Sequence, residues 1–242
     1  NVRCYSDKEY SDLGFNVVND VSSADVLIGV KEVPINKLIA NKKYFFFSHT
    51  IKKQPYNKNL LLSILDNNIE LFDHETIVDK NNNRLIGFGY YAGIVGAYNG
   101  FRAFGLKNNS FSLPKASDVK DRDQLNSELL KINIPTIKIV LTGKGRVGSG
   151  AKEILDFLNI KEISVSDYLN KSFNEAVYVQ IDVLNYNLRK DNQALDRFDF
   201  YKNPSDYKST FNRFSNVSDM FIAGHYYDKN APNLITLEDI NS

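Results

Sequence analysis

The sequence contains little cysteine, no long apolar run and almost no net charge. Cys4 is the one cysteine among 242 residues, which excludes an internal disulfide framework and a cysteine-rich zinc site and fits a reducing cytoplasm. No apolar run approaches the roughly 18 residues that a membrane span requires, and the sequence shows no signal peptide. We therefore expect a soluble, cytoplasmic protein that needs no metal and no membrane.

The two signs of charge nearly cancel. Lys and Arg together number 30 and Asp and Glu 29, and they are interspersed along the chain. Because a nucleic-acid-binding domain would carry a basic patch, we expect a small charged metabolite as the partner and no nucleic acid. The length of 242 residues exceeds the roughly 100 to 200 residues of a usual domain, which predicts two domains.

In the first half of the chain, short apolar runs alternate with helical patterns. The runs are too short for buried helices and rich in β-branched or aromatic residues, which predicts parallel strands joined by helical crossovers. The predicted strands are 25–30, 44–48, 69–73 and 84–88, and the predicted helices are 36–40, 59–65 and 91–104. Gly93, Gly96 and Gly100 in the last helix indicate that another backbone packs closely against it.

The second half repeats this alternation after a linker at 106–118. The predicted strands are 136–142, 161–165, 177–183 and 220–223, and the predicted helices are 119–130, 151–158 and 207–214. We therefore predict an α/β protein with two Rossmann-like domains and a cleft between them. Residues 1–113 form the N-terminal substrate domain and 114–242 the dinucleotide-binding domain, which has fewer strands than a complete dinucleotide fold.

A glycine-rich loop joins the first strand of the second domain to its helix. Gly143, Gly145 and Gly148 match the dinucleotide fingerprint, with Arg146 and Val147 between them. The first glycine allows the tight turn, the second lets backbone approach a pyrophosphate, and the third lets helix and strand pack closely, while the helix N-terminus attracts the anion. The alternative is a purely structural turn. No Walker-type Lys-Ser or Lys-Thr pair is present.

The choice between NAD and NADP stays open in the sequence. Enzymes that use NAD commonly have an acidic residue about 20 positions after the loop, at the end of the second strand, to bind the adenosine ribose. Serines occupy the expected tip here, and Asp167 follows slightly later. Asp167 is therefore the candidate ribose ligand, and a helix N-cap is the alternative role.

In the first domain, Lys31 and His49 each follow a predicted strand. Ligands of parallel α/β sheets bind outside the carboxyl ends of the strands, so the two side chains could share one cleft. Histidine titrates near neutral pH, and a lysine kept out of water can do so too. An exposed lysine and a structural histidine are the alternatives.

Three segments resemble the saccharopine dehydrogenase and lysine-ketoglutarate reductase group, which is related to alanine dehydrogenase. They are 29–34 (GVKEVP), 47–54 (FSHTIKKQ) and 87–93 (GFGYYAG), and the resemblance runs from about residue 3 to the chain end. It implies an NAD- or NADP-dependent enzyme that interconverts saccharopine with lysine and 2-oxoglutarate, so an amino acid and a 2-oxo acid are the expected partners.

The resemblance also implies roles for individual residues. Lys31 and His49 become the acid-base groups, and the remaining polar positions of the substrate cleft are Glu32, Lys52, Gln54 and Glu75. Lys52 and Gln54 would bind substrate carboxylates, and the two glutamates would tune the lysine. His74 stands where relatives have an aromatic residue, which indicates packing. His225 follows the last strand, where its backbone could contact the cofactor.

The sequence departs from the group at both ends. Family members begin with a strand and an arginine-bearing loop and end with an acidic residue near the nicotinamide, and neither segment is present. We therefore expect a chain that is incomplete at both ends. Two alternatives remain: an alanine dehydrogenase-like enzyme, and a relative that binds dinucleotide without catalysis.

Overall fold

The computed structural model describes residues 4–241, which form two compact units. One unit contains residues 5–88, and the other contains Cys4 and the chain from Gly89 onward. None of the described helices combines the length and the apolar character that crossing a bilayer requires.

The unit of residues 5–88 is built on a parallel three-stranded sheet in the order β1-β2-β3. Its elements are α1 (Asp7–Asp12), β1 (Val26–Lys31), β2 (Lys43–Phe47), α2 (Lys58–Asp66) and β3 (Glu70–Asp73). Leu60 and Ile64 of α2 pack on Tyr44 and Phe46 of β2, because alternate residues of a strand face the same side of the sheet. The three predicted strands of this sheet are confirmed.

The predicted strand at 84–88 is wrong. A single antiparallel bridge joins Val78 to Arg84, and no ladder continues from it. The Asp79 side chain accepts hydrogen bonds from the backbone amides of Asn81 and Asn83, which closes a tight turn after one residue pair. The predicted helix at 36–40 is also reduced to a single 3-10 turn, Ile35–Lys37.

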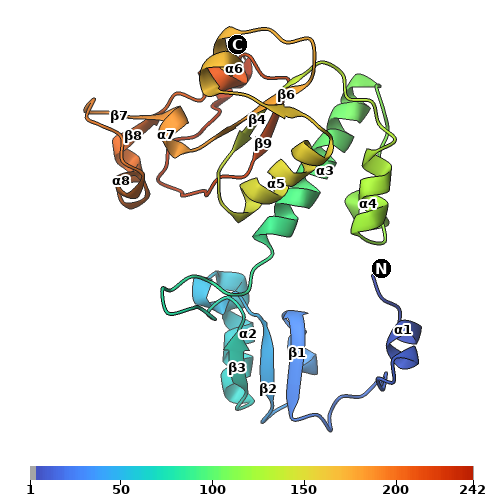
Figure 1. Ribbon diagram of the computed structural model, residues 1–242. Coiled ribbons are helices and arrows are strands. Elements are labelled where there is room, and N and C mark those ends of the chain that lie inside the picture. Colours follow the sequence, from blue (N-terminus) through green and yellow to red (C-terminus); the bar gives the residue numbers. More distant parts are fainter. Residues whose placement is uncertain (1–3, 242) are drawn as a thin grey trace. The chain divides into compact units, whose positions relative to one another are not determined.

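The second unit contains a parallel four-stranded sheet in the order β5-β6-β4-β9 (Figure 1). Its strands are β4 (Lys138–Thr142), β5 (Lys161–Glu162), β6 (Val177–Ile181) and β9 (Met220–Ala223). Both faces of β4 are covered: Ile139 and Leu141 belong to one buried cluster, and Val140 belongs to the other. Burial on both faces explains why this strand is apolar throughout.

Helices fill the two faces of this sheet. They are α3 (Gly89–Asn108), α4 (Arg122–Leu129), α5 (Arg146–Phe157), α6 (Val165–Asn170) and α9 (Asn212–Ser215), and α10 (Leu237–Asn241) ends the described chain. The predicted strand at 161–165 is shorter than expected, because Ser164 caps α6 with its side chain and the chain turns into that helix.

Helices α3 and α5 approach each other backbone to backbone (Figure 1). A Cβ added to Gly93 of α3 would lie 2.0 Å from the Val147 carbonyl oxygen, and one added to Gly150 of α5 would lie 1.9 Å from that of Tyr90. Of the three glycines predicted to face another backbone, Gly93 does so, whereas Gly96 faces open space and Gly100 faces the Met220 side chain. Since α3 packs on α5, the division between the units falls after Phe88, whereas the predicted boundary falls after residue 113.

A short excursion separates β6 from β9. It contains α7 (Val183–Tyr186), the antiparallel pair β7 (Asn187–Arg189) and β8 (Tyr207–Ser209), and α8 (Arg197–Lys202) between them. The predicted helix at 207–214 is therefore wrong in its first half. Tyr207 pairs with Arg189 across the two strands, and its hydroxyl donates to Asp199 at 2.6 Å, which holds this segment extended.

Candidate functional site

The carboxyl ends of β1, β2 and β3 gather the polar residues of the first unit. Lys31 ends β1 and pairs in register with Phe47, the last residue of β2, and His49 follows two residues later. Glu75 lies two residues beyond Asp73, the last residue of β3. Because parallel strands end at one edge of the sheet, the three residues emerge at the same edge.

Glu75 is the centre of an ion-pair cluster at this edge. His49 Nδ1 lies 3.0 Å from Glu75 Oε2, and Lys52 Nζ and Arg84 Nη1 lie 3.3 and 3.4 Å from Oε1. The Glu75 side chain is only 10% exposed. Burial alone would raise the pKa of Glu75, but the hydrogen bonds from His49 and Lys52 and the charges of Lys52 and Arg84 outweigh it and lower the pKa.

The cluster fixes the orientation of the His49 ring. Its Nδ1 lies closer to the Glu75 carboxylate, at 3.0 Å, than to the Lys52 ammonium, at 3.4 Å. We therefore assign the Nδ1 proton to the bond with Glu75, which leaves the lone pair on Nε2. Among the described residues no partner engages Nε2, so this nitrogen can exchange a proton with a bound molecule.

The structure does not bring every predicted residue into this cluster. Lys31, Glu32 and Gln54 are exposed, and within residues 4–241 no hydrogen bond or ion pair ties their side chains to another group. Lys31 is placed beside the cluster by strand register alone. Glu32 and Gln54 follow the strand ends without contacting Glu75, so the cleft roles given to them stay predictions.

Two buried contacts behind the cluster were not predicted. The Ser48 hydroxyl donates to Asp73 Oδ2 at 2.5 Å, and the Glu75 backbone amide donates to Asp73 Oδ1 at 2.9 Å. Both Ser48 and Asp73 are buried. The Asp73 carboxylate thus joins the segment that bears His49 to the segment that bears Glu75. In the sequence, both residues look like ordinary polar positions at strand ends.

His74 braces the same edge from the side of β1. Its ring lies 5.2 Å from that of Phe47, and its Nε2 is 3.1 Å from the Gly29 carbonyl oxygen. Gly29 lies where the register of β1 on β2 is interrupted, between Ile28 and Lys31. This carbonyl therefore takes its hydrogen bond from a side chain, and His74 has the packing role expected of it.

In the second unit, strand register brings three loops together. Thr142 of β4 pairs with Ile181 of β6 and with Ala223 of β9. The residues that follow these three strand ends are Gly143, Asp182 and Gly224, so they emerge side by side at the carboxyl edge of the sheet. The Gly143 amide donates to the Ile181 carbonyl at 2.7 Å, which ties the glycine loop to β6.

The glycine loop has the conformation that its sequence predicted. Gly143 has a φ of +88°, where a side chain would be strained, and a Cβ on Gly148 would lie 2.0 Å from the Gly143 carbonyl oxygen. Gly145 is the N-cap of α5 and faces open space. Helix α5 therefore begins without a side-chain cap, an arrangement suited to binding a phosphate.

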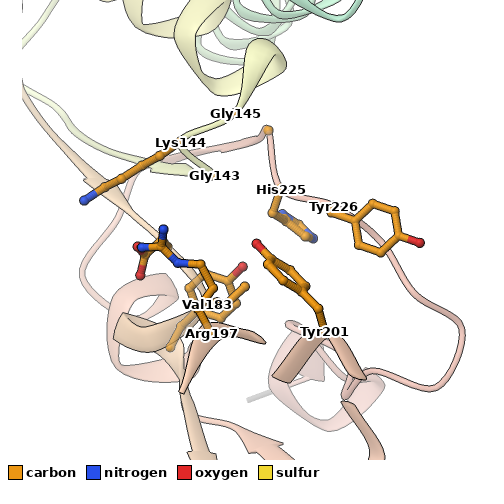
Figure 2. A pocket seen from close by; sticks show the side chains of 11 residues that line it. Gly143, Lys144, Gly145, Val183, Arg197, Tyr201, His225 and Tyr226 are labelled. Carbon is orange, nitrogen blue, oxygen red and sulfur yellow. The ribbon is translucent and has the colours of Figure 1, made fainter. Parts of the chain in front are cut away.

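A cavity of about 280 Å³ opens beside this loop (Figure 2). Gly143, Lys144 and Gly145 form one wall, and further lining comes from the ends of β6 and β9 and from α7 and α8. Lys144 and Arg197 lie on one side of the cavity, and His225, Tyr201 and Tyr226 lie on the other (Figure 2). The loop, the uncapped helix and the Lys144 ammonium together fit the phosphate-bearing part of a dinucleotide.

The residues predicted to bind the cofactor divide into three groups. Gly143, Gly145 and His225 line the cavity. Gly148 packs behind the loop, and Arg146 and Val147 begin α5, where Val147 packs against Gly93 of α3. Asp167 lies in α6, half-buried, with its Oδ1 2.8 Å from Lys171 Nζ, and it does not line the cavity.

The sheet order separates Asp167 from the glycine loop. The prediction followed the spacing along the chain, whereas β6 lies between β4 and β5, so the role given to Asp167 stays a prediction. The acidic residue at the tip of the neighbouring strand is Asp182, which does line the cavity. Arg197 Nη2 lies 2.5 Å from Asp182 Oδ2. No spacing rule in the sequence pointed to this pair.

His225 contributes its ring as well as its backbone. Its Nδ1 lies 2.6 Å from the buried Thr142 hydroxyl, and the ring stacks on Phe221 and meets the Tyr186 ring edge-on. Burial lowers the pKa of His225, which keeps the imidazole neutral at neutral pH. Within the described part of the chain, no group of three or more His, Cys, Asp or Glu side chains is placed to hold a metal ion.

Known proteins match the whole chain in sequence. Residues 1–95 match the alanine dehydrogenase/PNT N-terminal domain. The mitochondrial alpha-aminoadipic semialdehyde synthase of Mus musculus is 32% identical over 269 residues, which cover 100% of this chain and 29% of the mouse protein. The saccharopine dehydrogenase (NAD+, L-lysine-forming) of Yarrowia lipolytica is 28% identical over 68% of this chain and 49% of its own length.

Solved structures share the fold. An L-alanine dehydrogenase has a TM-score of 0.51 at 13% identity and covers 98% of this chain with 58% of its own. The transhydrogenase from Sinorhizobium meliloti has a TM-score of 0.55 at 14% identity and covers 98% of this chain with 62% of its own. This likeness shows an α/β fold with parallel sheets. The sequence matches confirm the resemblance: the chain is similar to alpha-aminoadipic semialdehyde synthase and to saccharopine dehydrogenase, and its first 95 residues match the alanine dehydrogenase/PNT N-terminal domain.

Proposed function

We propose that this chain forms part of a nicotinamide-dependent oxidoreductase that acts on the CH–NH group of an opine-type amino acid and interconverts saccharopine with lysine and 2-oxoglutarate. The observation that carries the proposal is the His49–Glu75 pair at the strand ends, with the Nε2 of His49 left available. The glycine-loop cavity of the second unit supports the use of NAD or NADP. The chain spans 29% of the mouse relative, so the activity is proposed for the protein that contains it.

The chemistry needs proton transfers that these side chains can perform. In the direction of saccharopine formation, the lysine amine adds to the oxo carbon, water leaves, and the imine carbon gains a hydride. A bound nicotinamide supplies that hydride and accepts it in the reverse direction. His49 and Lys31 hold or move protons at the nitrogen and at the carbinol oxygen, and Glu75 holds the His49 ring in place.

Two cations at the same edge suit the substrate. Saccharopine and 2-oxoglutarate both carry carboxylates, and Lys52 is 47% exposed, so its ammonium can reach a ligand as well as Glu75. Arg84, at 44% exposed, shares the same carboxylate oxygen of Glu75. We therefore assign carboxylate binding to Lys52, with Arg84 as a further candidate and Gln54 as a hydrogen-bond donor.

Turnover by the purified full-length protein tests the proposal. Reduced dinucleotide should be consumed only when lysine and 2-oxoglutarate are supplied together, and His49→Gln should lower the rate by about 10² to 10⁴ while dinucleotide still binds. Consumption with pyruvate and ammonia, but not with lysine, would identify an alanine dehydrogenase-like enzyme instead. Binding of dinucleotide without turnover of either pair would indicate a relative that binds without catalysis.

A further inference from the structure

We propose that Ser48 and Asp73 are positioning residues: their buried hydrogen bond holds His49 in a left-handed backbone conformation that presents its ring to Glu75. The inference rests on the proposed function, because it names residues that act on the reaction through His49. It starts from the backbone of His49, which has a φ of +56° and a ψ of +10°. A residue with a side chain is strained there, and it persists only where its surroundings enforce that conformation.

The left-handed residue turns the chain back directly after β2. The Lys52 amide donates to the His49 carbonyl at 3.1 Å, and Lys53, whose φ is +51°, ends this single 3-10 turn. The turn brings both side chains to one carboxylate: Lys52 Nζ and His49 Nδ1 lie 3.3 and 3.0 Å from the two oxygens of Glu75. Two members of the cluster therefore depend on one backbone conformation.

The Ser48 hydroxyl ties together the residues before and after His49. A hydroxyl has one proton to donate and two lone pairs that accept. The proton goes to Asp73 Oδ2 at 2.5 Å, and the oxygen accepts from the Thr50 amide at 3.1 Å and from the Thr50 hydroxyl at 2.7 Å. Ser48 is fully buried, and all three hydrogen-bonding positions of its hydroxyl are occupied. The backbone on both sides of His49 is therefore fixed.

Asp73 anchors this arrangement to β3. It is the last residue of that strand and is buried, and its Oδ1 accepts from the Glu75 amide at 2.9 Å and from the Ser48 amide at 3.4 Å. One carboxylate thus holds the backbone next to each partner of the ion pair. Removing the Ser48 hydroxyl leaves Asp73 without a donor and the Thr50 amide without an acceptor, so His49 is free to leave its strained conformation.

The conformation matters for the reaction because it sets which ring nitrogen of His49 is available. With Nδ1 on Glu75, the proton lies on Nδ1 and the lone pair on Nε2. A His49 that leaves the left-handed region turns its ring away from Glu75, and the proton then distributes between the two nitrogens. Ser48 and Asp73 are buried behind the cluster, so they act on the reaction only through the residues that they hold.

Steady-state kinetics of the full-length protein test whether Ser48 acts through His49. Ser48→Ala should lower kcat by about 10- to 100-fold where His49 is present, because a misplaced acid-base group fails at the chemical step. Added to His49→Gln, the same substitution should leave the residual kcat unchanged, since the group that it positions is already gone. The KM for 2-oxoglutarate should rise in both backgrounds, because Lys52 is displaced in either case.

Three further variants sharpen the comparison. Ser48→Thr keeps the hydroxyl and should restore most of kcat, whereas Asp73→Asn, whose amide nitrogen cannot accept the Ser48 proton, should behave like Ser48→Ala. Ser63→Ala is the matched control, because its hydroxyl also accepts a side-chain hydrogen bond, from Asn67 in α2, and it should leave kcat unchanged. An equal loss of kcat from Ser48→Ala with and without His49 would overturn the inference and leave the proposed function standing.

Urea unfolding tests the strain without relying on turnover. Glycine adopts a left-handed backbone at no steric cost, so His49→Gly should unfold at a higher urea concentration than His49→Ala. The same pair at His74, which has no positive φ, should show the opposite order. If His49→Ala is the more stable of its pair, His49 is not held under strain and the inference is wrong. A folded wild type that does not turn over lysine with 2-oxoglutarate would overturn the proposed function and this inference with it.

Discussion

At the residue scale, Glu75 holds the polar side chains of the first unit together. Its carboxylate meets His49, Lys52 and Arg84 within 3.0 to 3.4 Å while being almost fully buried. A buried carboxylate is tolerated only with such partners, so the cluster is stable as a whole and sensitive to the loss of any member. The same bond that satisfies Glu75 leaves the reactive nitrogen of His49 turned away from it.

Replacing Glu75 with Gln should lower turnover by about 10- to 100-fold, because the His49 ring loses the anion that orients its Nδ1 proton. Steady-state kinetics should place the loss mainly in kcat, since His49 and not Glu75 is assigned to the chemistry. Lys43 and Glu70 form an exposed ion pair in the same unit, so Glu70→Gln serves as the matched control and should leave kcat unchanged. Equal losses in the two variants would contradict the positioning role.

The lowered pKa of Glu75 also predicts how stability depends on pH. The unfolded chain binds the proton near the usual pKa of 4.5, and the folded chain binds it only at lower pH. Glu75 therefore stabilises the unit fully above pH 4.5, and this contribution is lost as the pH falls through the lowered value. Urea unfolding at a series of acidic pH values should show a smaller loss of stability in Glu75→Gln than in the wild type.

At the element scale, the glycines of α3 and α5 were readable from the sequence and the strand order was not. Three glycines in one helical pattern indicate a close neighbour, and Gly93 confirms it. Strand order depends on which long-range pairings form, and the spacing along the chain does not tell whether β5 or β6 pairs with β4. The sequence therefore identified the glycine loop but not the acidic residue at the tip of the strand that pairs with it, Asp182.

Replacing Gly150 with Ala should lower the free energy of unfolding by about 1 to 3 kcal/mol, because the new Cβ would overlap the Tyr90 carbonyl oxygen. Gly96→Ala in α3 is the control. A Cβ there meets nothing within 4 Å, and alanine favours the helix by up to about 1 kcal/mol, so this variant should be as stable as the wild type or more so. Destabilisation by both substitutions would argue against the packing of α3 on α5.

At the scale of the whole molecule, α3 is part of the core of the second unit. Ile94, Tyr98 and Phe101 of α3 are buried in the same cluster as Ile139 and Leu141 of β4. The predicted boundary after residue 113 separates these partners, because a linker was inferred from turn-forming residues alone. Turn signals mark where a helix ends, but they do not tell which sheet that helix covers.

Two truncations distinguish the boundaries. A chain of residues 89–242 should unfold cooperatively and bind reduced dinucleotide, since it retains α3 and the cavity. A chain of residues 114–242 should expose the buried cluster that α3 shares with β4, and we expect it to aggregate or to unfold without a sharp transition. Circular dichroism melting curves and analytical ultracentrifugation compare them. Cooperative unfolding of the shorter chain would support the boundary after residue 113.

The pairing of β4 with β6 makes the distance between Asp182 and the glycine loop independent of the length of the segment between β5 and β6. Asp182 lies 37 positions after Gly145 in the chain, yet the two residues follow adjacent strands, because β4 and β6 are hydrogen-bonded to each other. The segment from Ile163 to Ala176, which contains α6, lies outside that ladder. An insertion or deletion there would leave Asp182 beside the glycine loop. The residue that faces the glycine loop in such chains is better found through the strand that pairs with the glycine-loop strand than through a fixed number of residues.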